Sequence, residues 1–189
     1  MKDLQDKLSA PFTQIVNGKE VPAHKWKLLT NKGDVVPYIT AAQVKQRLNE
    51  VFGVEGWQSM LSETTKNFLI CDLQVKINNE WVSKADVGTE SDYAAEKGMA
   101  SDAIKRAAKS LGIGAYLDNL PHLKFTMKGN SVVTDKGQLV SKYDGKALSD
   151  YINTGCPMST PLRMIYSALS EDSQKKYSEM FKEIFDELS

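Results

Sequence analysis

The chain has 189 residues, of which 41% are apolar and 25% are charged, and this length is enough for one main hydrophobic core with a small appendage. Its 24 basic residues balance its 24 acidic residues, so bulk attraction to nucleic acid is disfavoured and any phosphate binding must depend on local positive potential. A run of about 18 apolar residues, which a transmembrane helix needs, does not occur in the sequence.

The first third of the chain contains few regular signals. It begins with a polar amphipathic stretch, MKDLQDKLSAPF, which lacks the apolar core of a signal peptide, so we expect a cytoplasmic protein. A short strand is predicted at 26–29, followed by a turn at 31–33. The segment 35–38 is predicted to be extended, because Pro37 keeps the residue before it out of the helical region.

A helix is predicted at 40–52. Thr40 and Gln43 have the spacing of a capping box, in which each side chain bonds to the backbone amide of the other residue. Gly53 provides a C-terminal stop. The apolar residues between these signals recur at helical spacing: Val44, Leu48, Val51 and Phe52.

Three antiparallel strands are predicted after this helix. The first covers 57–64, and the second, at 69–77, alternates apolar and polar side chains as a half-buried strand does. Matching the apolar faces of the second and third strands predicts a three-residue loop at 78–80. The predicted pairs are Ile77 with Trp81, Leu73 with Ala85 and Cys71 with Val87.

The two cysteines indicate neither a disulfide framework nor a thiolate site. Cys71 lies inside the second strand, and Cys156 lies far away beside a proline. Both are expected to be reduced and structural.

The predicted register also brings two carboxylates together. It places Asp72 opposite Asp86, with Glu90 and Asp92 just beyond them, and adjacent carboxylates can hold Mg²⁺. This pattern permits an alternative function, a metal-dependent nuclease. A slipped register, or a polar sheet face on which both carboxylates are hydrated, would also account for it.

A second long helix is predicted at about 94–111, beginning from Ser91 or Asp92 and ending at Gly112. Its apolar stripe is rich in alanine, and small residues allow a helix to approach a sheet closely. The stripe consists of Ala100, Ala103, Ile104, Ala107, Ala108 and Leu111. We therefore predict an α+β fold in which a three-stranded antiparallel meander packs against this helix.

The other face of this helix is the densest basic surface of the chain. Lys105 and Lys109 are four residues apart and point the same way. Arg106 flanks them, and Lys97 lies two turns earlier. This layout is suited to following a sugar-phosphate backbone, with each cation neutralising a phosphate. The alternative is a solvated helix face that is partly neutralised by Asp102.

A short helical turn through Tyr116 and Leu117 is predicted to close a core domain, which we place at residues 1–121. Residues 122–145 form a predicted connector. It contains a small hairpin at 132–140, because Asp135-Lys136-Gly137 favours a turn.

Residues 146–189 are predicted to form a helical C-terminal appendage, with helices near 146–153, 160–169 and 171–188. Residues 1–145 carry 19 Lys and Arg against 17 Asp and Glu, whereas residues 146–189 carry 5 against 7, so acid collects in the appendage. The last helix is amphipathic, which permits a third function: a protein-interaction module that docks a partner or a neighbouring subunit through this helix.

Neither a cofactor nor catalysis is expected. His24 and His122 lie too far apart in the sequence to suggest a local metal pair. The sequence contains no Gly-rich nucleotide-binding loop, nucleophile elbow or Cys-x-x-Cys motif. We therefore predict that the protein is not an enzyme and uses no cofactor or metal.

The aromatic residues are expected to divide between core and surface. Phe52, Trp57 and Trp81 are predicted to lie in the core. Tyr38 is the aromatic residue that we expect to stack or hydrogen-bond, because a partly exposed tyrosine has both an apolar ring and a polar tip.

One long segment resembles a known family. Residues 96–108, EKGMASDAIKRAA, followed by Leu111-Gly112-Ile113-Gly114 and Tyr116-Leu117, are similar to the signature of the Rad-fifty-two single-strand annealing family, particularly its phage and bacterial branch of Sak-like and DdrA-like proteins. Tyr38-Ile39, Val51-Phe52-Gly53 and Gly56-Trp57 resemble the same family. The resemblance covers about residues 25–121 and does not extend beyond Pro121.

The resemblance implies ATP-independent binding and annealing of single-stranded DNA in homologous recombination and DNA repair. It also implies a ring oligomer, and the cytoplasm of a bacterium or a phage-infected host as the location. Lys105 and Arg106 would hold the phosphate backbone in a groove around the ring, with Lys109 beside them and the bases exposed for pairing. Neither nucleotide hydrolysis nor a metal is needed for this task.

Further residues follow from the same resemblance. Tyr38 matches a tyrosine of the family's inner groove, and Lys27 is the counterpart of a basic residue just ahead of it. Lys66, at the first hairpin, is assigned to an outer site. Ala115 stands where bacterial relatives often carry a basic residue, which implies that one phosphate contact is missing here.

The implied partners are single-stranded DNA and other copies of the chain. The 171–188 helix is in addition a candidate docking site for single-strand-binding or recombination proteins, because it combines an apolar stripe with acidic residues.

Overall fold

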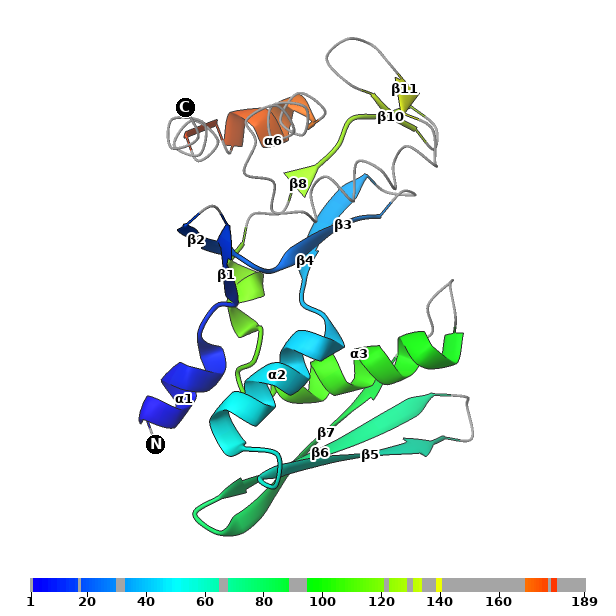
Figure 1. Ribbon diagram of the computed structural model, residues 1–189. Helices are drawn as coiled ribbons and strands as arrows, with labels where there is room; N and C mark the ends of the chain where they lie inside the picture. The colour runs from blue at the N-terminus through cyan, green and yellow to red at the C-terminus, as the bar shows by residue number, and fades with distance from the viewer. Residues whose placement is uncertain are drawn as a thin grey trace. The chain divides into compact units, whose positions relative to one another are not determined.

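The structure is a computed structural model, and it describes residues 2–16, 18–29, 33–64, 68–88, 95–120, 123–128, 131–133, 139–140, 169–176 and 178–179. Residue contacts divide the chain into two compact units, one made of 1–12 and 39–118 and the other of 13–38 and 119–189. Figure 1 shows the elements of both units. Residues 13–38, which the sequence-based division places in the core domain, thus cluster with the C-terminal part of the chain. The boundaries at 121 and 145 stay a prediction.

The first unit is built on a three-stranded antiparallel sheet in the order β5-β6-β7. Its strands are β5 (Trp57–Glu63), β6 (Leu69–Ile77) and β7 (Glu80–Gly88). The alternation in β6 buries Cys71, Leu73 and Val75 completely. The predicted meander is confirmed, and burial raises the pKa of the Cys71 thiol.

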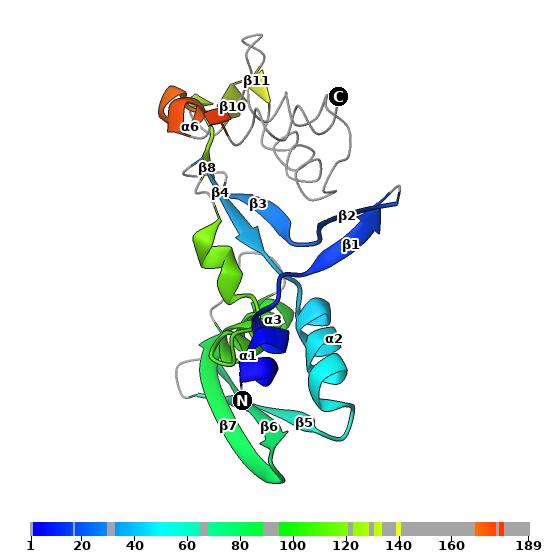
Figure 2. The same ribbon diagram turned by 90° about the vertical axis from the view of Figure 1, so that its left-hand side faces the viewer.

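Two helices lie on one side of this sheet, as Figures 1 and 2 show from two directions. α2 (Ala41–Phe52) begins after Thr40, and its predicted capping box is formed. The Gln43 amide donates to Thr40 Oγ1 at 3.2 Å, and the Thr40 amide donates to Gln43 Oε1 at 2.9 Å. α3 (Ala95–Lys109) contacts β6 and β7. Both long helices predicted from the sequence are therefore confirmed.

The alanine stripe of α3 faces the sheet. Ala103, Ala107 and Ala108 are fully buried, as the helical spacing predicts. The predicted start at Ser91 or Asp92 lies outside the described residues.

Gly88, the last residue of β7, lies where α3 passes close to the sheet. A Cβ at this position would overlap the carbonyl oxygen of Met99 and lie 2.9 Å from the amide nitrogen of Ala103. Because both atoms belong to the backbone of α3, they cannot move aside as a side chain does. We expect Gly88→Ala to lower the free energy of unfolding by about 1–3 kcal/mol, since overpacking forces the backbone to shift.

Urea denaturation followed by tryptophan fluorescence measures this effect. Ser59→Ala, at an exposed position of the same sheet, is the control and should change the free energy by less than about 0.5 kcal/mol. An equally small change for Gly88→Ala would contradict the close approach.

The hairpin between β6 and β7 differs from the prediction by one residue. It turns on Asn78 and Asn79, which both have positive φ, at 52° and 66°. A two-residue hairpin turn of type I′ requires positive φ at both central residues, and asparagine tolerates this conformation. The predicted loop at 78–80 is wrong because apolar matching was given more weight than the turn chemistry of Asn-Asn. The observed pairs are Ile77 with Glu80, Leu73 with Lys84 and Cys71 with Asp86.

The observed register separates the two carboxylates. Asp72 pairs with Ala85, and Asp86 pairs with Cys71, so the two carboxylates occupy opposite faces of the sheet. Asp72 instead accepts hydrogen bonds from Gln74 Nε2 at 2.8 Å and from Ser83 Oγ. The predicted Asp72–Asp86 pair, on which the nuclease alternative rested, is therefore wrong.

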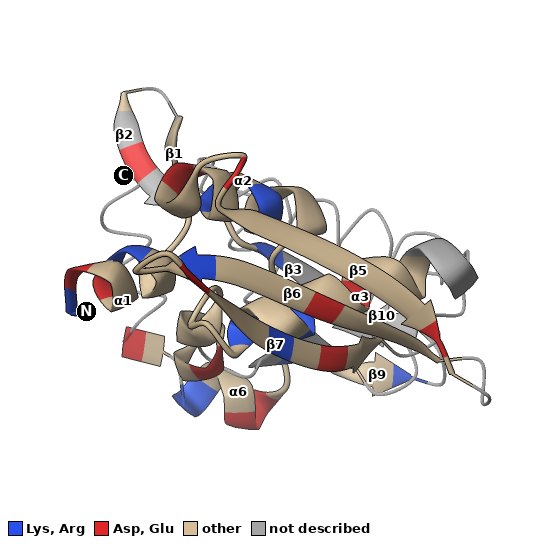
Figure 3. Cartoon of the chain, turned by 90° about the horizontal axis from the view of Figure 1, so that it is seen from below, with Lys and Arg blue, Asp and Glu red and all other residues tan. Residues whose placement is uncertain are grey.

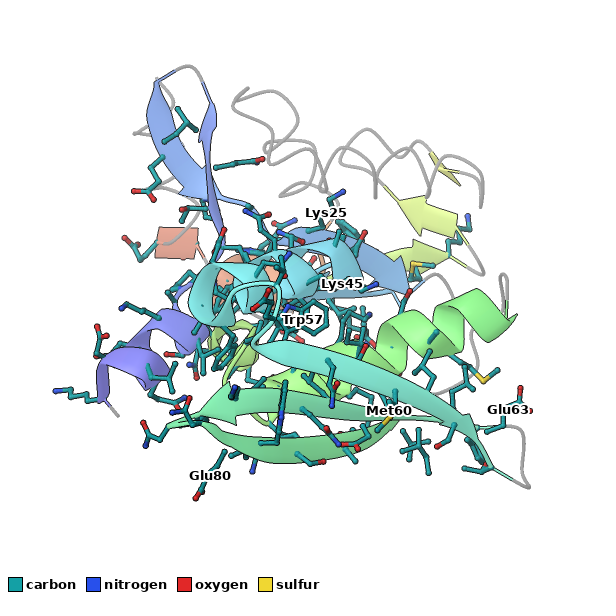
Figure 4. The ribbon with its side chains drawn as sticks, turned by 60° about the horizontal axis from the view of Figure 1, so that its bottom comes forward. Lys25, Lys45, Trp57, Met60, Glu63 and Glu80 are labelled. Carbon is teal, nitrogen blue, oxygen red and sulfur yellow. The ribbon has the colours of Figure 1, made fainter. Side chains whose placement is uncertain are left out.

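The same shift moves Trp81 out of the core. Trp81 is 48% exposed and pairs with Lys76, so its prediction as a core residue is wrong. Phe52 and Trp57 are half-buried. Trp57 Nε1 donates to Asn49 Oδ1 at 2.7 Å, and Figure 4 labels Trp57 at the start of β5.

The N-terminal lead contains regular structure that the sequence analysis did not predict. α1 (Lys2–Ser9) belongs to the first unit, where Leu8 and Phe12 are buried. β1 (Thr13–Val16) and β2 (Lys19–Pro22) form an antiparallel hairpin of the second unit. Elements of eight and four residues are too short for a periodic pattern to identify them.

The second unit contains two further small sheets within its described residues. One has the order β3-β4-β8, formed by β3 (Lys25–Leu29), β4 (Asp34–Tyr38) and β8 (Leu123–Lys124). The other has the order β11-β10-β9, formed by β9 (Met127–Lys128), β10 (Ser131–Val133) and β11 (Leu139–Val140). The strand and extended segment predicted before residue 39 are confirmed, as is the pairing of the small hairpin at 132–140.

The C-terminal part is described only in segments. α6 (Glu171–Lys176) belongs to the helix predicted at 171–188. Leu169 pairs with Phe125 in an isolated antiparallel bridge, so the prediction of a helix at 160–169 is wrong at its last residue. The rest of that helix, and the one predicted at 146–153, lie outside the described residues. No helix in the described segments has the length and apolar character needed to cross a bilayer.

Candidate nucleic-acid interface

The basic face of α3 lies opposite its buried alanine stripe. The side chains of Arg106 and Lys109 are 51% and 48% exposed, and that of Lys105 is 29% exposed. The 3.6-residue period of the helix separates these cations from the stripe. Figure 3 shows basic segments on α3 behind a strand, β7, that carries both basic and acidic segments.

Each of these three cations is paired with a carboxylate. The pairs are Lys105 Nζ with Asp102 Oδ1 at 3.7 Å, Arg106 Nε with Asp86 Oδ1 at 3.1 Å, and Lys109 Nζ with Asp118 Oδ1 at 2.7 Å. The sequence analysis anticipated Asp102 and missed the other two partners, which lie outside the helix. Ion pairs this exposed are worth about 0–1 kcal/mol each, so they can open when a stronger anion approaches.

Asp118 reaches Lys109 because the chain turns after α3. Gly112 and Gly114 have positive φ, at 99° and 78°, a conformation that glycine adopts without strain. This turn leads into a short 3₁₀ helix, η1 (Ala115–Asn119), which carries Asp118. The Gly-Ile-Gly segment therefore determines which carboxylate meets the last cation of α3.

Two hydrogen bonds favour the ionised form of Asp86. The Val87 amide donates to Asp86 Oδ1 at 2.7 Å, and Arg106 Nε donates to the same oxygen at 3.1 Å. The amide first, and then the Arg106 guanidinium, hold the pKa of Asp86 below its ordinary value against the opposing effect of burial. Asp86 thus contributes a negative charge to the basic face, so the net charge of this face is lower than the sequence of α3 alone indicates.

The other predicted binding residues either belong to the second unit or have side chains outside the described residues. Tyr38 ends β4 in the second unit and is half-buried. Lys97 lies in α3 and Lys27 in β3, but their side chains lie outside the described residues, as does Lys66 entirely.

One buried cation of the first unit was not predicted from the sequence. Arg47 in α2 is 8% exposed, and its Nη1 donates to the carbonyl oxygens of Lys7 at 2.7 Å and Ala10 at 2.8 Å. Its guanidinium lies 4.4 Å from the centroid of the Phe12 ring. The signal was present, since Arg47 follows Val44 by three residues and so lies on the apolar side of the helix. Arg47 holds the N-terminal segment against α2.

Comparison with known proteins identifies the family of the chain. A model described as "Rad52/22 family double-strand break repair protein" matches residues 1–135. Two curated relatives are both named "single-stranded DNA-binding protein DdrA". The one from Deinococcus deserti is 32% identical over 130 residues, which cover 64% of this chain and 59% of the relative. The one from Deinococcus radiodurans is 31% identical over 130 residues, which cover 64% and 57%.

The matched part spans less than two thirds of the length of these relatives. The family model, in contrast, covers well over half of this chain, including α2, the sheet and α3. The family model extends beyond the predicted range of 25–121 at both ends, but the family resemblance itself is confirmed, and the chain belongs to the Rad52/22 family of double-strand break repair proteins.

Proposed function

We propose that the protein binds single-stranded DNA and anneals complementary strands without ATP, as a ring-like oligomer that acts in homologous recombination and DNA repair. Two relatives have names that state single-stranded DNA binding, and the family description states double-strand break repair. The observation that carries the proposal is the basic face of α3, where Arg106 and Lys109 are about half exposed within the matched residues.

Annealing sets two physical requirements. The repulsion between two phosphate backbones must be reduced, and the pairing edges of the bases must stay free. Cations that contact phosphates meet both requirements, and Lys105, Arg106 and Lys109 would each contact one. Their carboxylate partners are partly exposed, and bidentate contacts between arginine and phosphate are among the stronger hydrogen-bonded pairs. Phosphate can therefore take the place of a carboxylate or share its cation.

The remaining binding residues enter the proposal through the family resemblance. Lys97 lies two turns before Lys105 on α3 and would extend the same row of phosphate contacts. Tyr38 and Lys27 would line the groove that holds the strand, and Lys66 would belong to an outer site.

A ring of subunits is part of the proposal because a few cations per subunit bind DNA weakly. Repeated contact with one strand multiplies the affinity through effective concentration. β5 is an edge strand of its sheet and exposes Met60 at 55% and Leu61 at 50%. Figure 4 labels Met60 on this strand. Exposed apolar side chains on an edge strand favour contact with another chain.

The proposal assigns a role to each of the three predicted parts of the chain. Residues 1–121 would form the annealing core, 122–145 a connector and 146–189 an appendage. The acidic helix at 171–188 would cap the ring or dock single-strand-binding or recombination proteins.

An annealing assay with two complementary labelled oligonucleotides tests the proposed function. The protein should accelerate annealing without ATP and in the presence of EDTA, because phosphate neutralisation requires neither. Its affinity for labelled oligo(dT) should fall steeply with salt, with a log–log slope of about −0.7 for each phosphate contacted. Non-complementary oligonucleotides are the control.

Two results would contradict the proposed function. Oligo(dT) left unbound at low salt would exclude it, and strand cleavage that requires Mg²⁺ would favour a nuclease instead.

A further inference from the structure

The ion pair between Arg106 and Asp86 joins α3 to the sheet. Arg106 Nε donates to Asp86 Oδ1 at 3.1 Å across 20 positions of sequence. The two side chains are 51% and 32% exposed, and pairs this exposed add little to the stability of a fold. Stabilisation of the fold is therefore a weak explanation for this ion pair.

Asp86 is itself held in place by its own strand. The Val87 amide donates to Asp86 Oδ1 at 2.7 Å, the same oxygen that accepts from Arg106. Gly88, two residues further along β7, lies against the backbone of α3 at Met99 and Ala103. The carboxylate is thus fixed at a point where the strand and the helix are in close contact.

The contact through Nε leaves the rest of the guanidinium group available. Arginine has five N–H donors in a rigid planar fork, and its two terminal Nη groups can contact two phosphate oxygens at once. In the described part of the chain, no hydrogen bond occupies either Nη group of Arg106. The carboxylate therefore restricts rotation of the guanidinium group without blocking the donor pair that suits a phosphate.

We propose that Asp86 is a positioning residue for DNA binding, which orients Arg106 so that both Nη groups face a phosphate of the bound strand. This inference rests on the proposed function and names a residue that acts through Arg106. Lys105 and Lys109 differ, since an ammonium group is a compact point charge with rotatable donors. Their partners, Asp102 and Asp118, neutralise them without orienting them.

The Asp86→Ala variant distinguishes an effect of Asp86 on the orientation of Arg106 from an effect of its negative charge alone. Removing a negative charge beside a DNA-binding arginine should tighten binding if charge alone matters. If Asp86 orients Arg106, Asp86→Ala should instead weaken the binding of oligo(dT) by about tenfold, the loss of a charged hydrogen bond. The salt slope should also become shallower by about 0.7 for each subunit that engages the strand.

If Asp86 positions Arg106, Asp86→Asn should retain the DNA affinity that Asp86→Ala loses. The amide oxygen still accepts from Arg106 Nε, so affinity should stay within about threefold of the unmutated protein. Fluorescence anisotropy over a series of salt concentrations measures all variants, and thermal unfolding followed by circular dichroism confirms that each is folded.

Two further variants serve as controls. Asp72→Ala removes the same charge from the opposite face of the same sheet and should keep the affinity unchanged. In an Arg106→Ala background, Asp86→Ala should cause no further loss, because no guanidinium group remains to be oriented. A variant that merely unfolds would lose binding in both backgrounds.

Failure of this inference is distinguishable from failure of the proposed function. If the unmutated protein binds oligo(dT) and Asp86→Ala binds it equally well or more tightly, the positioning role is overturned and the proposed function stands. If the unmutated protein does not bind, the proposed function fails and the inference fails with it.

Discussion

Replacing Lys105 and Arg106 together with alanine is expected to lower the affinity for single-stranded DNA by about a hundredfold and to abolish annealing, because two phosphate-binding cations are removed from every subunit. Arg106 is half exposed on α3, and Lys105 lies beside it. The log–log slope of affinity against salt should become shallower by about 0.7 for each phosphate that is no longer neutralised. Anisotropy with labelled oligo(dT) measures the affinity and the slope, and fluorescence quenching measures annealing.

A charge-matched double variant is the control for this prediction. Lys2→Ala/Lys76→Ala removes the same charge from exposed positions on α1 and β6. It should keep the affinity within about threefold, since these cations make no proposed phosphate contact. Equal losses of affinity in the two double variants would mean that overall charge, and not the face of α3, determines binding.

Arg47→Ala is expected to lower the free energy of unfolding by about 2–4 kcal/mol, because it removes several hydrogen bonds from a charged group and leaves their acceptors unsatisfied. The Arg47 guanidinium donates to the carbonyl oxygens of Lys7 and Ala10 and lies 4.4 Å from the centroid of the Phe12 ring. Without it, the carbonyl groups that follow α1 lose their donors while still partly buried. Urea denaturation followed by tryptophan fluorescence measures the change.

Two variants of the same helix complete this test. Lys45→Ala, at an exposed position of α2, should change the free energy by less than about 0.5 kcal/mol. Arg47→Lys should give an intermediate decrease, because one ammonium group replaces a planar fork of five donors. A decrease below about 1 kcal/mol for Arg47→Ala would show that other contacts hold the N-terminal segment.

The two long helices and the meander of the first unit could be predicted from short-range patterns, whereas the short α1 could not. The capping box of Thr40 and Gln43 identified the start of α2, and the alternation in β6 identified its buried face. The prediction failed at the hairpin of Asn78 and Asn79, where two criteria conflicted. The turn conformation was decisive because a two-residue loop of type I′ requires positive φ at both positions, which asparagine accepts more readily than most residues.

The cations of the candidate site and one of their partners, Asp102, could be predicted from the sequence, but Asp86 and Asp118 could not. Lys105, Arg106 and Lys109 follow from helical spacing together with the family resemblance. The sequence predicted that Asp86 pairs with Asp72 as a candidate metal ligand. This prediction failed because a register error of one residue moves a side chain to the other face of the sheet. In the observed register Asp86 lies on the face covered by α3, where it meets Arg106.

The sequence by itself determined α2 and α3, the meander, the basic face of α3 and the family, because caps, periodicity and a contiguous motif depend on residues within a few positions of one another. Only the tertiary structure decided which carboxylate meets Arg106 and where Arg47 binds. These contacts join residues that are 20 and 40 positions apart. They depend on how a helix packs on a sheet and how a terminal segment folds back, which no local pattern encodes.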